Sequence, residues 1–183
     1  MRSYWSFFAT IDEDLHELSR FIEFHPDNLK TFSAYLLRLY LAAGSEVDVV
    51  AKLLCLQIDP TQKPDRITEY QPIITGKYPK LEDLNIHVRG TQITVWGSYN
   101  DVKHRRHMHY PDANLANVLS AAAGLLVLLV YLCKDELFEK EGGKPHVRPD
   151  FRVFALDYRY VTGPMSFGHT YNFPDLAPPP PLL

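Results

Sequence analysis

The 183-residue chain is long enough for one domain with a substantial apolar core, and two domains of ordinary size would be crowded into it. Its composition, 46% hydrophobic and 22% charged, excludes an intrinsically disordered chain. The formal net charge of −3 excludes a general attraction to nucleic acid or to an anionic membrane, so any basic binding surface has to be local.

The two cysteines, Cys55 and Cys133, each stand alone in apolar sequence. This pattern predicts two buried thiols in a reducing compartment and argues against a disulfide framework or a cysteine-based zinc site. The chain opens without a basic leader and a following apolar segment, so we expect no secretory signal and a cytoplasmic location.

The N-terminal half predicts two long helices. Apolar residues recur at spacings of three and four from residue 4 to about 24, which is typical of an amphipathic helix. The sequence HPDN at 25–28 interrupts this pattern and offers a cap for a second helix over about 29–56. Gly44 and Ser45 are the candidates to bend or split this second helix.

Shorter elements are expected next along the chain. A loop at 59–65 precedes a short helix, RITEYQPIIT, which we expect Asp65 to cap and Gly76 to end. Residues 77–97 read as irregular, and the alternation within IHVRGTQITVW predicts either a small β hairpin or an extended loop.

The most apolar segment, VLSAAAGLLVLLVYLC from Val118 to Cys133, has no charged residue. A membrane-spanning helix needs about 20 apolar residues, and polar residues close this segment early at both ends. We therefore expect a core helix over about 113–138, capped by Asp112 and surrounded by other helices, and no membrane partner.

The sequence changes character after this helix. EKEGGKPHVRPD predicts a linker, FRVFALDYRYV alternates as one or two strands would, and PDLAPPPPLL predicts an extended tail. The expected fold is mainly α: a helical bundle over 1–140, with a small β hairpin or an extended C-terminal element. Residues 141–183 are expected to form a linker, a short β segment and a Pro-rich tail that pack on the same domain.

A basic stretch, residues 103–109 (KHRRHMH), directly precedes the apolar helix. Three of the eight histidines, His104, His107 and His109, fall here among three cations. We expect a helical run from about residue 96 that Tyr110-Pro111 interrupts, because a residue before proline disfavours helical geometry. On a helix over 96–107, spacings of three and four bring five side chains to one face: Trp96, Asn100, Lys103, His104 and His107.

This face suits chemistry on a phosphodiester. Imidazole is the side chain best suited to move protons near neutral pH, and a neighbouring cation stabilises charge that develops on a phosphate. His104 would then act as general base or acid, Lys103 and Arg106 would contact phosphate, and Asn100 would position the reacting groups. No metal is required for such cleavage of RNA.

Two simpler interpretations of the same residues stay open. The stretch is also typical of a basic surface helix, or of an internal polar network in which Asn100 and His104 satisfy buried backbone groups. A metal site on the three histidines is disfavoured, because no carboxylate or cysteine stands at a ligand spacing and the adjacent cations oppose metal binding.

The pattern W-x-x-YNxxKHxR, followed by ANLANVLSAAAGLLVLLVYL, resembles the HEPN superfamily of small helical-bundle proteins in prokaryotes. FSAYLLRLYLAAGSEVDVVAK is similar to the earlier long helix of that family, and the resemblance covers roughly residues 4–138. It implies an α-helical bundle, a homodimer and action on or near RNA. Many members are metal-independent ribonucleases of toxin–antitoxin, phage-defence or RNA-processing systems, so no cofactor is expected.

The chain departs from the family motif at one position. The motif has Arg, often followed by Asn and, after a gap, by His; Asn100 and His104 match it, but Tyr99 occupies the Arg position. Tyrosine carries no positive charge at neutral pH and lacks the bidentate grip of a guanidinium. Substitutes for phosphate binding are Lys103 and Arg106.

The resemblance also assigns supporting roles. Arg105, His107 and Tyr99 are expected to contact RNA or phosphate, and Glu46 or Asp48 of the second helix is expected to orient His104 or Lys103. The alternative for the two acids is a solvated stretch of helix. Asn117, near the start of the apolar helix, is expected either to face the site or to cap the backbone.

Three functions follow from these residues. The first is a HEPN-like protein with a degenerate motif that acts on or binds RNA or a nucleotide, in a toxin–antitoxin or phage-defence setting. The second is a non-catalytic HEPN-like module that binds a protein partner through the same face. The third is an active metal-independent endoribonuclease that uses His104.

Overall fold

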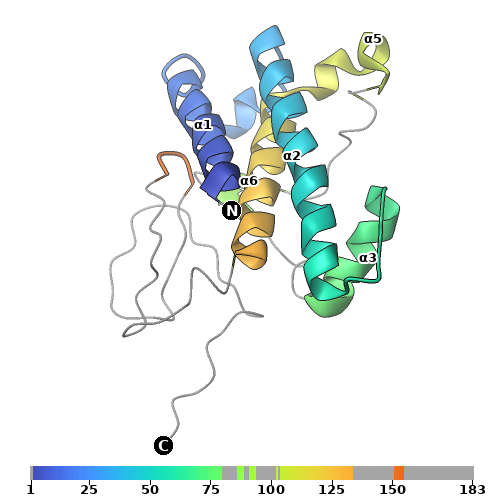
Figure 1. Cartoon of the computed structure of the whole chain (residues 1–183). Coiled ribbons are helices and arrows are strands. Elements are labelled where there is room, and N and C mark those ends of the chain that lie inside the picture. The colour runs from blue at the N-terminus through green and yellow to red at the C-terminus, as the bar shows by residue number, and fades with distance from the viewer. Residues whose placement is uncertain are drawn as a thin grey trace, which may run out of the picture.

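The computed structural model describes residues 2–79, 86–88, 91–93, 102, 104–133 and 151–154, and these are mainly helical, as the sequence predicts (Figure 1). The longer elements are α1 (Arg2–Leu18), α2 (Ala34–Ile58), α3 (Ile67–Lys77), α5 (Arg106–His109) and α6 (Leu115–Leu132), with the short strands β1 (Ile86–Val88) and β2 (Thr91–Ile93). Two 3-10 turns, Pro26–Asn28 and Tyr110–Asp112, precede α2 and α6.

Helix α6 is the centre of the core. Figure 1 shows it running between α1 and α2, and it packs against both. Every residue from Val118 to Leu132 is buried, as expected for a helix that is apolar all round. Among the described residues, α6 is the one helix long and apolar enough to cross a membrane, with a mean hydropathy of 2.2, yet 83% of it is buried inside the protein. That burial is typical of a core helix.

Helix α2 is continuous, so Gly44 and Ser45, the candidates to bend or split it, do not split it. Ser33 caps it, with its Oγ accepting a hydrogen bond from the N–H of Leu36 at 3.1 Å, and the helix then runs unbroken to Ile58. Gly44 is buried within it. A glycine inside a helix costs about 1 kcal/mol relative to alanine, and packing along α6 more than offsets so small a local cost.

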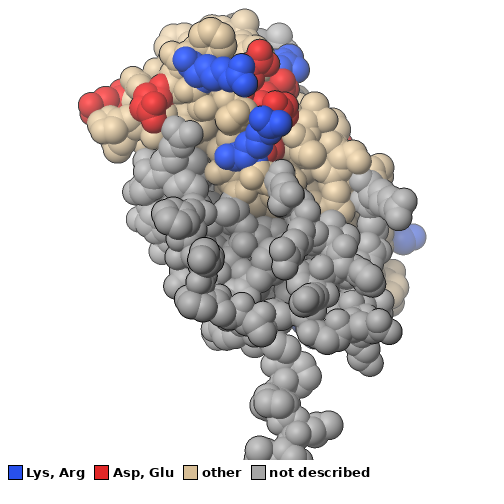
Figure 2. All heavy atoms as spheres, turned by 90° about the vertical axis from the view of Figure 1, so that its left-hand side faces the viewer, with Lys and Arg blue, Asp and Glu red and all other residues tan. Residues whose placement is uncertain are grey.

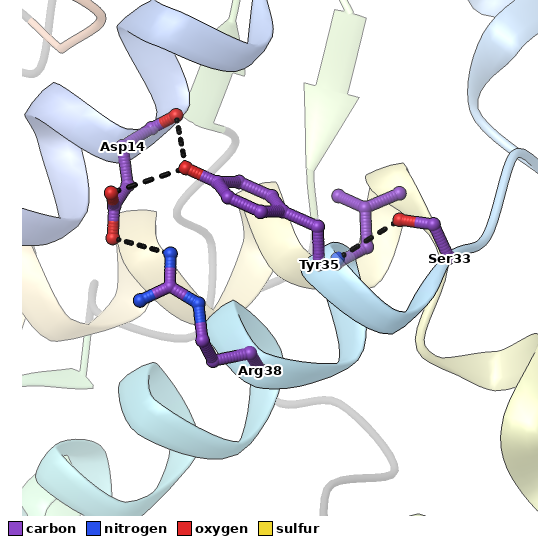
Figure 3. A network of polar contacts seen from close by, with 5 residues as sticks. Asp14, Ser33, Tyr35 and Arg38 are labelled. Carbon is purple, nitrogen blue, oxygen red and sulfur yellow. Dashed lines mark hydrogen bonds and ion pairs between the residues drawn. The ribbon is translucent and has the colours of Figure 1, made fainter.

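A polar cluster joins α1 to α2 (Figure 3). The Tyr35 hydroxyl donates to a carboxylate oxygen of Asp14 at 3.1 Å, and Arg38 pairs with the other oxygen at 3.0 Å. The Arg38 guanidinium also lies 4.7 Å from the centre of the Tyr35 ring. Partial burial, and then the contact with Asp14, raise the pKa of Tyr35 above its usual value. Tyr35 of α2 therefore stays protonated at neutral pH and donates its hydrogen bond to Asp14 of α1.

The start of α6 differs from the prediction. Its cap is Asn114, whose side-chain oxygen accepts from the N–H of Asn117 at 3.1 Å, whereas Asp112 was expected in this role. The Asp112 carboxylate instead contacts His109 Nδ1 at 2.7 Å. Asp112 lies in the preceding 3-10 turn, two residues too early to reach the free N–H groups of the helix.

Helix α3 also starts without the expected cap. Asp65 binds Lys52 Nζ at 3.0 Å, and the Glu69 carboxylate accepts the N–H groups of Asp65 and Arg66 at 2.7 and 3.3 Å. Gly76 stands in the last turn, and the helix ends one residue later. The Asp65 carboxylate is thus engaged with Lys52 of α2, and the Glu69 side chain binds the backbone that leads into α3.

The remaining described segments are short. Strands β1 and β2 pair antiparallel, with Ile86 opposite Ile93 and Val88 opposite Thr91. Residues 151–154, where a strand was expected, form bends that pack on α1, and the rest of the predicted C-terminal strand and the Pro-rich tail lie outside the described residues. The bends arise because the carboxylate of Asp12 accepts hydrogen bonds from successive backbone N–H groups there, which a sheet would have used for pairing.

Candidate functional site

The basic stretch connects two buried residues at one end of the bundle. Val102 and Ala113 are each 0% exposed, and between them the chain makes α5 and a 3-10 turn. In Figure 1, α5 lies beside the end of the bundle at which α2 begins, away from α3. The intervening residues are therefore carried on a short projection whose two ends are anchored in the core.

The continuous helix predicted for residues 96–107 is interrupted. His104 is helical, Arg105 is not, with φ −129° and ψ 40°, and α5 begins afresh at residue 106. His104 and His107 therefore do not share a face of one helix, and the prediction is wrong on this point. The physical reason is that the chain has to return from Val102 to Ala113 in the core, whereas a straight helix would carry it about 1.5 Å further away with each residue.

Several predicted site residues lie outside the described part of the chain. These are Trp96, Tyr99, Asn100 and Lys103. Arg106 is the first residue of α5, and only its backbone is among the parts of the chain that the structure describes. The proposed roles of these residues in catalysis and phosphate binding stay predictions.

Four other members of the stretch are open to solvent. His104, Arg105 and His107 are exposed, and Met108 is 68% exposed. The sequence from 102 to 111 contains no acidic residue. The next acid, Asp112, already contacts His109. Among the described side chains of the stretch, Arg105 thus offers an exposed cation that has no acidic neighbour in the sequence.

The α1 side of the molecule has a different character. Figure 2 shows Lys and Arg side chains lying next to Asp and Glu on this face. Residues of α1 form ion pairs with other parts of the chain, Asp14 with Arg38 at 3.0 Å and Glu13 with Arg152 at 2.9 Å. Paired charges of this kind attract an anion weakly, so the basic stretch is the better candidate for binding one.

The N-terminus of α6, which follows the stretch, does not contribute anion-binding donors. The N–H groups of Leu115 and Ala116 donate to the carbonyls of Thr31 and Leu29 at 2.9 and 3.0 Å. Those of the next two residues donate to the side chain and the carbonyl of Asn114. The first four N–H groups of the helix are therefore satisfied, and a phosphate here would have to be held by side chains.

The predicted supporting residues are engaged elsewhere or stay untested. Asp48 pairs with Lys52 at 2.9 Å, toward the α3 end of α2. Glu46 is partly exposed on the same helix, and its support of His104 stays a prediction. Asn117 serves the backbone, since its amide donates to the carbonyl of Asp112 at 2.7 Å.

One feature of the site has no sequence signal. Phe32 and Tyr110 pack edge to face beside the basic stretch, with ring centroids 5.5 Å apart and planes at 84°. Phe32 is 46% exposed. The two residues meet because the segment before α2 forms a bridge with Asn114 at the start of α6, a long-range pairing that neither spacing nor composition indicates.

The described residues contain no group of three or more His, Cys, Asp or Glu side chains placed to hold a metal ion. Comparison of the chain with family models, curated proteins and solved structures gives no match. The resemblance to the HEPN superfamily therefore rests on the motif residues and the helical pattern of the sequence.

Proposed function

We propose that this protein binds RNA at the basic stretch and does not cleave it. The supporting observation is that His104, Arg105 and His107 are exposed together on a projection anchored by two buried residues. Cations that contact phosphates supply most of the affinity of proteins for nucleic acid. Since the protein as a whole is slightly acidic, attraction elsewhere is weak and the ligand is directed to this segment.

Two features favour binding over catalysis. General acid–base cleavage requires a base and a phosphate-stabilising cation held in fixed geometry within about 3 Å of the reacting atoms. The non-helical Arg105 separates His104 from His107, and Tyr99 stands where the family motif has a charged arginine. The proposal therefore assigns the chain to a degenerate HEPN-like bundle, acting as a homodimer in a toxin–antitoxin or phage-defence setting.

The experiment that tests binding is a titration of fluorescently labelled, unstructured RNA of about 20 nucleotides, followed by anisotropy at several salt concentrations. Arg105→Gln removes one exposed cation of the stretch, and Lys63→Gln removes one exposed cation at the α3 end as the matched control. We expect Arg105→Gln to weaken binding several-fold and to reduce the salt slope by about 0.7. Lys63→Gln should leave both quantities unchanged.

The absence of cleavage is checked in the same samples. Labelled RNA incubated with the protein and a chelator should stay intact on a denaturing gel. Cleavage that disappears in His104→Ala would overturn the non-catalytic proposal and favour the endoribonuclease. Equal binding by wild type and Arg105→Gln, or no binding by the wild type, would overturn the assignment of RNA to this stretch.

A further inference from the structure

Beside the basic stretch, apolar side chains from two distant parts of the chain are exposed together. Phe32 precedes α2 and is 46% exposed, and it packs edge to face with Tyr110, which directly follows α5. Met108, two residues before Tyr110, is 68% exposed. Exposed apolar side chains next to a charged segment are typical of a ligand-binding surface.

The position of Phe32 is fixed by the scaffold on both sides. The preceding carbonyl, of Thr31, accepts the N–H of Leu115 at 2.9 Å, and Phe32 itself forms a β-bridge with Asn114. The following residue, Ser33, caps α2. The backbone at Phe32 is therefore fixed before a ligand binds, so less ordering is needed on binding, which favours a role in recognition.

We propose that Phe32 and Tyr110 form a base-stacking platform, so that the ligand of the basic stretch is single-stranded RNA with unpaired bases. This inference rests on the proposed function. An edge-to-face pair covers one face of one ring, and Phe32 keeps nearly half of its surface open to a base. In a duplex the base faces are covered by neighbouring pairs, so a platform of this kind contacts only unpaired bases.

The positive charge of Arg105 beside the platform favours a nucleic acid as the ligand over an apolar protein surface. Arg105 and His107 are exposed within five residues of Tyr110 in the chain, and no acid intervenes. Surfaces that bind single strands combine aromatic rings for the bases with cations for the backbone. An apolar protein partner would have to leave the Arg105 guanidinium without a counter-charge.

The platform is tested by comparing an unstructured RNA of cytidine and adenosine repeats with an RNA duplex of equal length. Phe32→Leu keeps an apolar side chain but removes the ring, and Tyr110→Leu does the same at the second position. Phe21→Leu is the matched control, because Phe21 is 81% exposed in the turn after α1. Thermal melting of each variant establishes that it is folded.

We expect the wild type to prefer the single strand. Phe32→Leu should weaken single-strand binding by about tenfold and leave duplex binding and the salt slope unchanged. The control Phe21→Leu should bind the single strand with the same affinity as the wild type. The platform is overturned if the wild type binds both RNAs equally and Phe32→Leu has no effect on binding. The proposed function stands in that case, provided that Arg105→Gln still weakens binding. If the wild type binds neither RNA, both are overturned.

A measurement on the unaltered protein covers the case in which the variants do not fold. RNA that contains 5-iodouridine crosslinks to stacked aromatic side chains under long-wavelength ultraviolet light, and peptide mass spectrometry locates the attachment. Crosslinks at Phe32 or Tyr110 support the platform. Crosslinks found only at other residues overturn it.

Discussion

Asp12 in α1 accepts a hydrogen bond from the backbone N–H of Val153 at 3.0 Å, although 141 positions separate the two residues. The same carboxylate also accepts the N–H groups of Arg152 and Phe154. Asp12 is only 2% exposed, and Phe151 packs against the ring of Phe8 at 4.7 Å. One buried carboxylate thus fastens the segment 151–154 to the first helix.

Replacing this carboxylate should destabilise the protein. Asp12→Ala leaves three N–H groups without their acceptor, and each buried unsatisfied group costs about 1–3 kcal/mol. We expect the free energy of unfolding, measured by urea denaturation, to fall by about 3 kcal/mol. Glu13→Gln is the control, because its exposed ion pair with Arg152 is worth about 0.5 kcal/mol. Equal stability of the two variants would contradict the anchoring role.

The buried thiol of Cys55 should be unreactive in the folded protein. Burial raises its pKa to about 11. At pH 8 about one molecule in a thousand then carries the reactive thiolate. Labelling of Cys55 with a disulfide reagent, followed by peptide mapping, should be slow in the native protein and fast in denaturant. Rapid labelling without denaturant would contradict the burial of this thiol.

The contact between Lys52 and Asp65 predicts a pH dependence with a definite sign. The hydrogen bond from Lys52 lowers the pKa of Asp65 below its usual value. Its stabilising effect is therefore present above the unfolded-state pKa of about 3.9 and is lost as the pH falls through the lower folded-state value. We expect Asp65→Asn to lower the melting temperature slightly at neutral pH and not in strong acid.

The control for this pH dependence is Asp65→Asn in a protein from which the Lys52 ammonium has been removed. In a Lys52→Met background, Asp65→Asn should lose most of its effect at neutral pH, because the largest contribution to the lowered Asp65 pKa is gone. A loss of stability that is independent of pH, or that persists in this background, would show that Asp65 acts through another contact.

The start of α6 predicts a ranking of two substitutions. Asn114→Ala removes the side-chain acceptor of the Asn117 N–H and should cost about 1 kcal/mol. Asp112→Ala removes a partly exposed contact with His109, which is worth less. Chemical denaturation of both variants checks this order. A larger loss for Asp112→Ala would restore it as the cap expected from the sequence.

The sequence predicted those elements that local composition determines. The uncharged run of α6, closed early by polar residues, predicted a buried core helix, and the spacing of apolar residues located α1 and α2. The break at Arg105 could not be predicted in the same way, because it follows from the need to return the chain to the core at Ala113. Helical periodicity describes one segment and carries no information about where the chain goes next.

The candidate site was predicted only in part for a similar reason. The basic stretch is visible in the sequence because its residues are adjacent, whereas Phe32 joins it through a bridge between distant segments. Asp12 had a signal that was overlooked: it stands four residues after Phe8 and three before Leu15, on the apolar stripe of α1. A carboxylate at such a position is expected to have buried partners.

Binding of RNA at the basic stretch can be located on the folded, unaltered protein. Hydrogen exchange of backbone amides, followed by mass spectrometry with and without saturating RNA, reports which segments the ligand protects. Binding at the basic stretch requires protection of peptides covering residues 104–113 and 29–33, and none in the loop at 59–66. Protection confined to other segments, or no change anywhere in the chain, would contradict it.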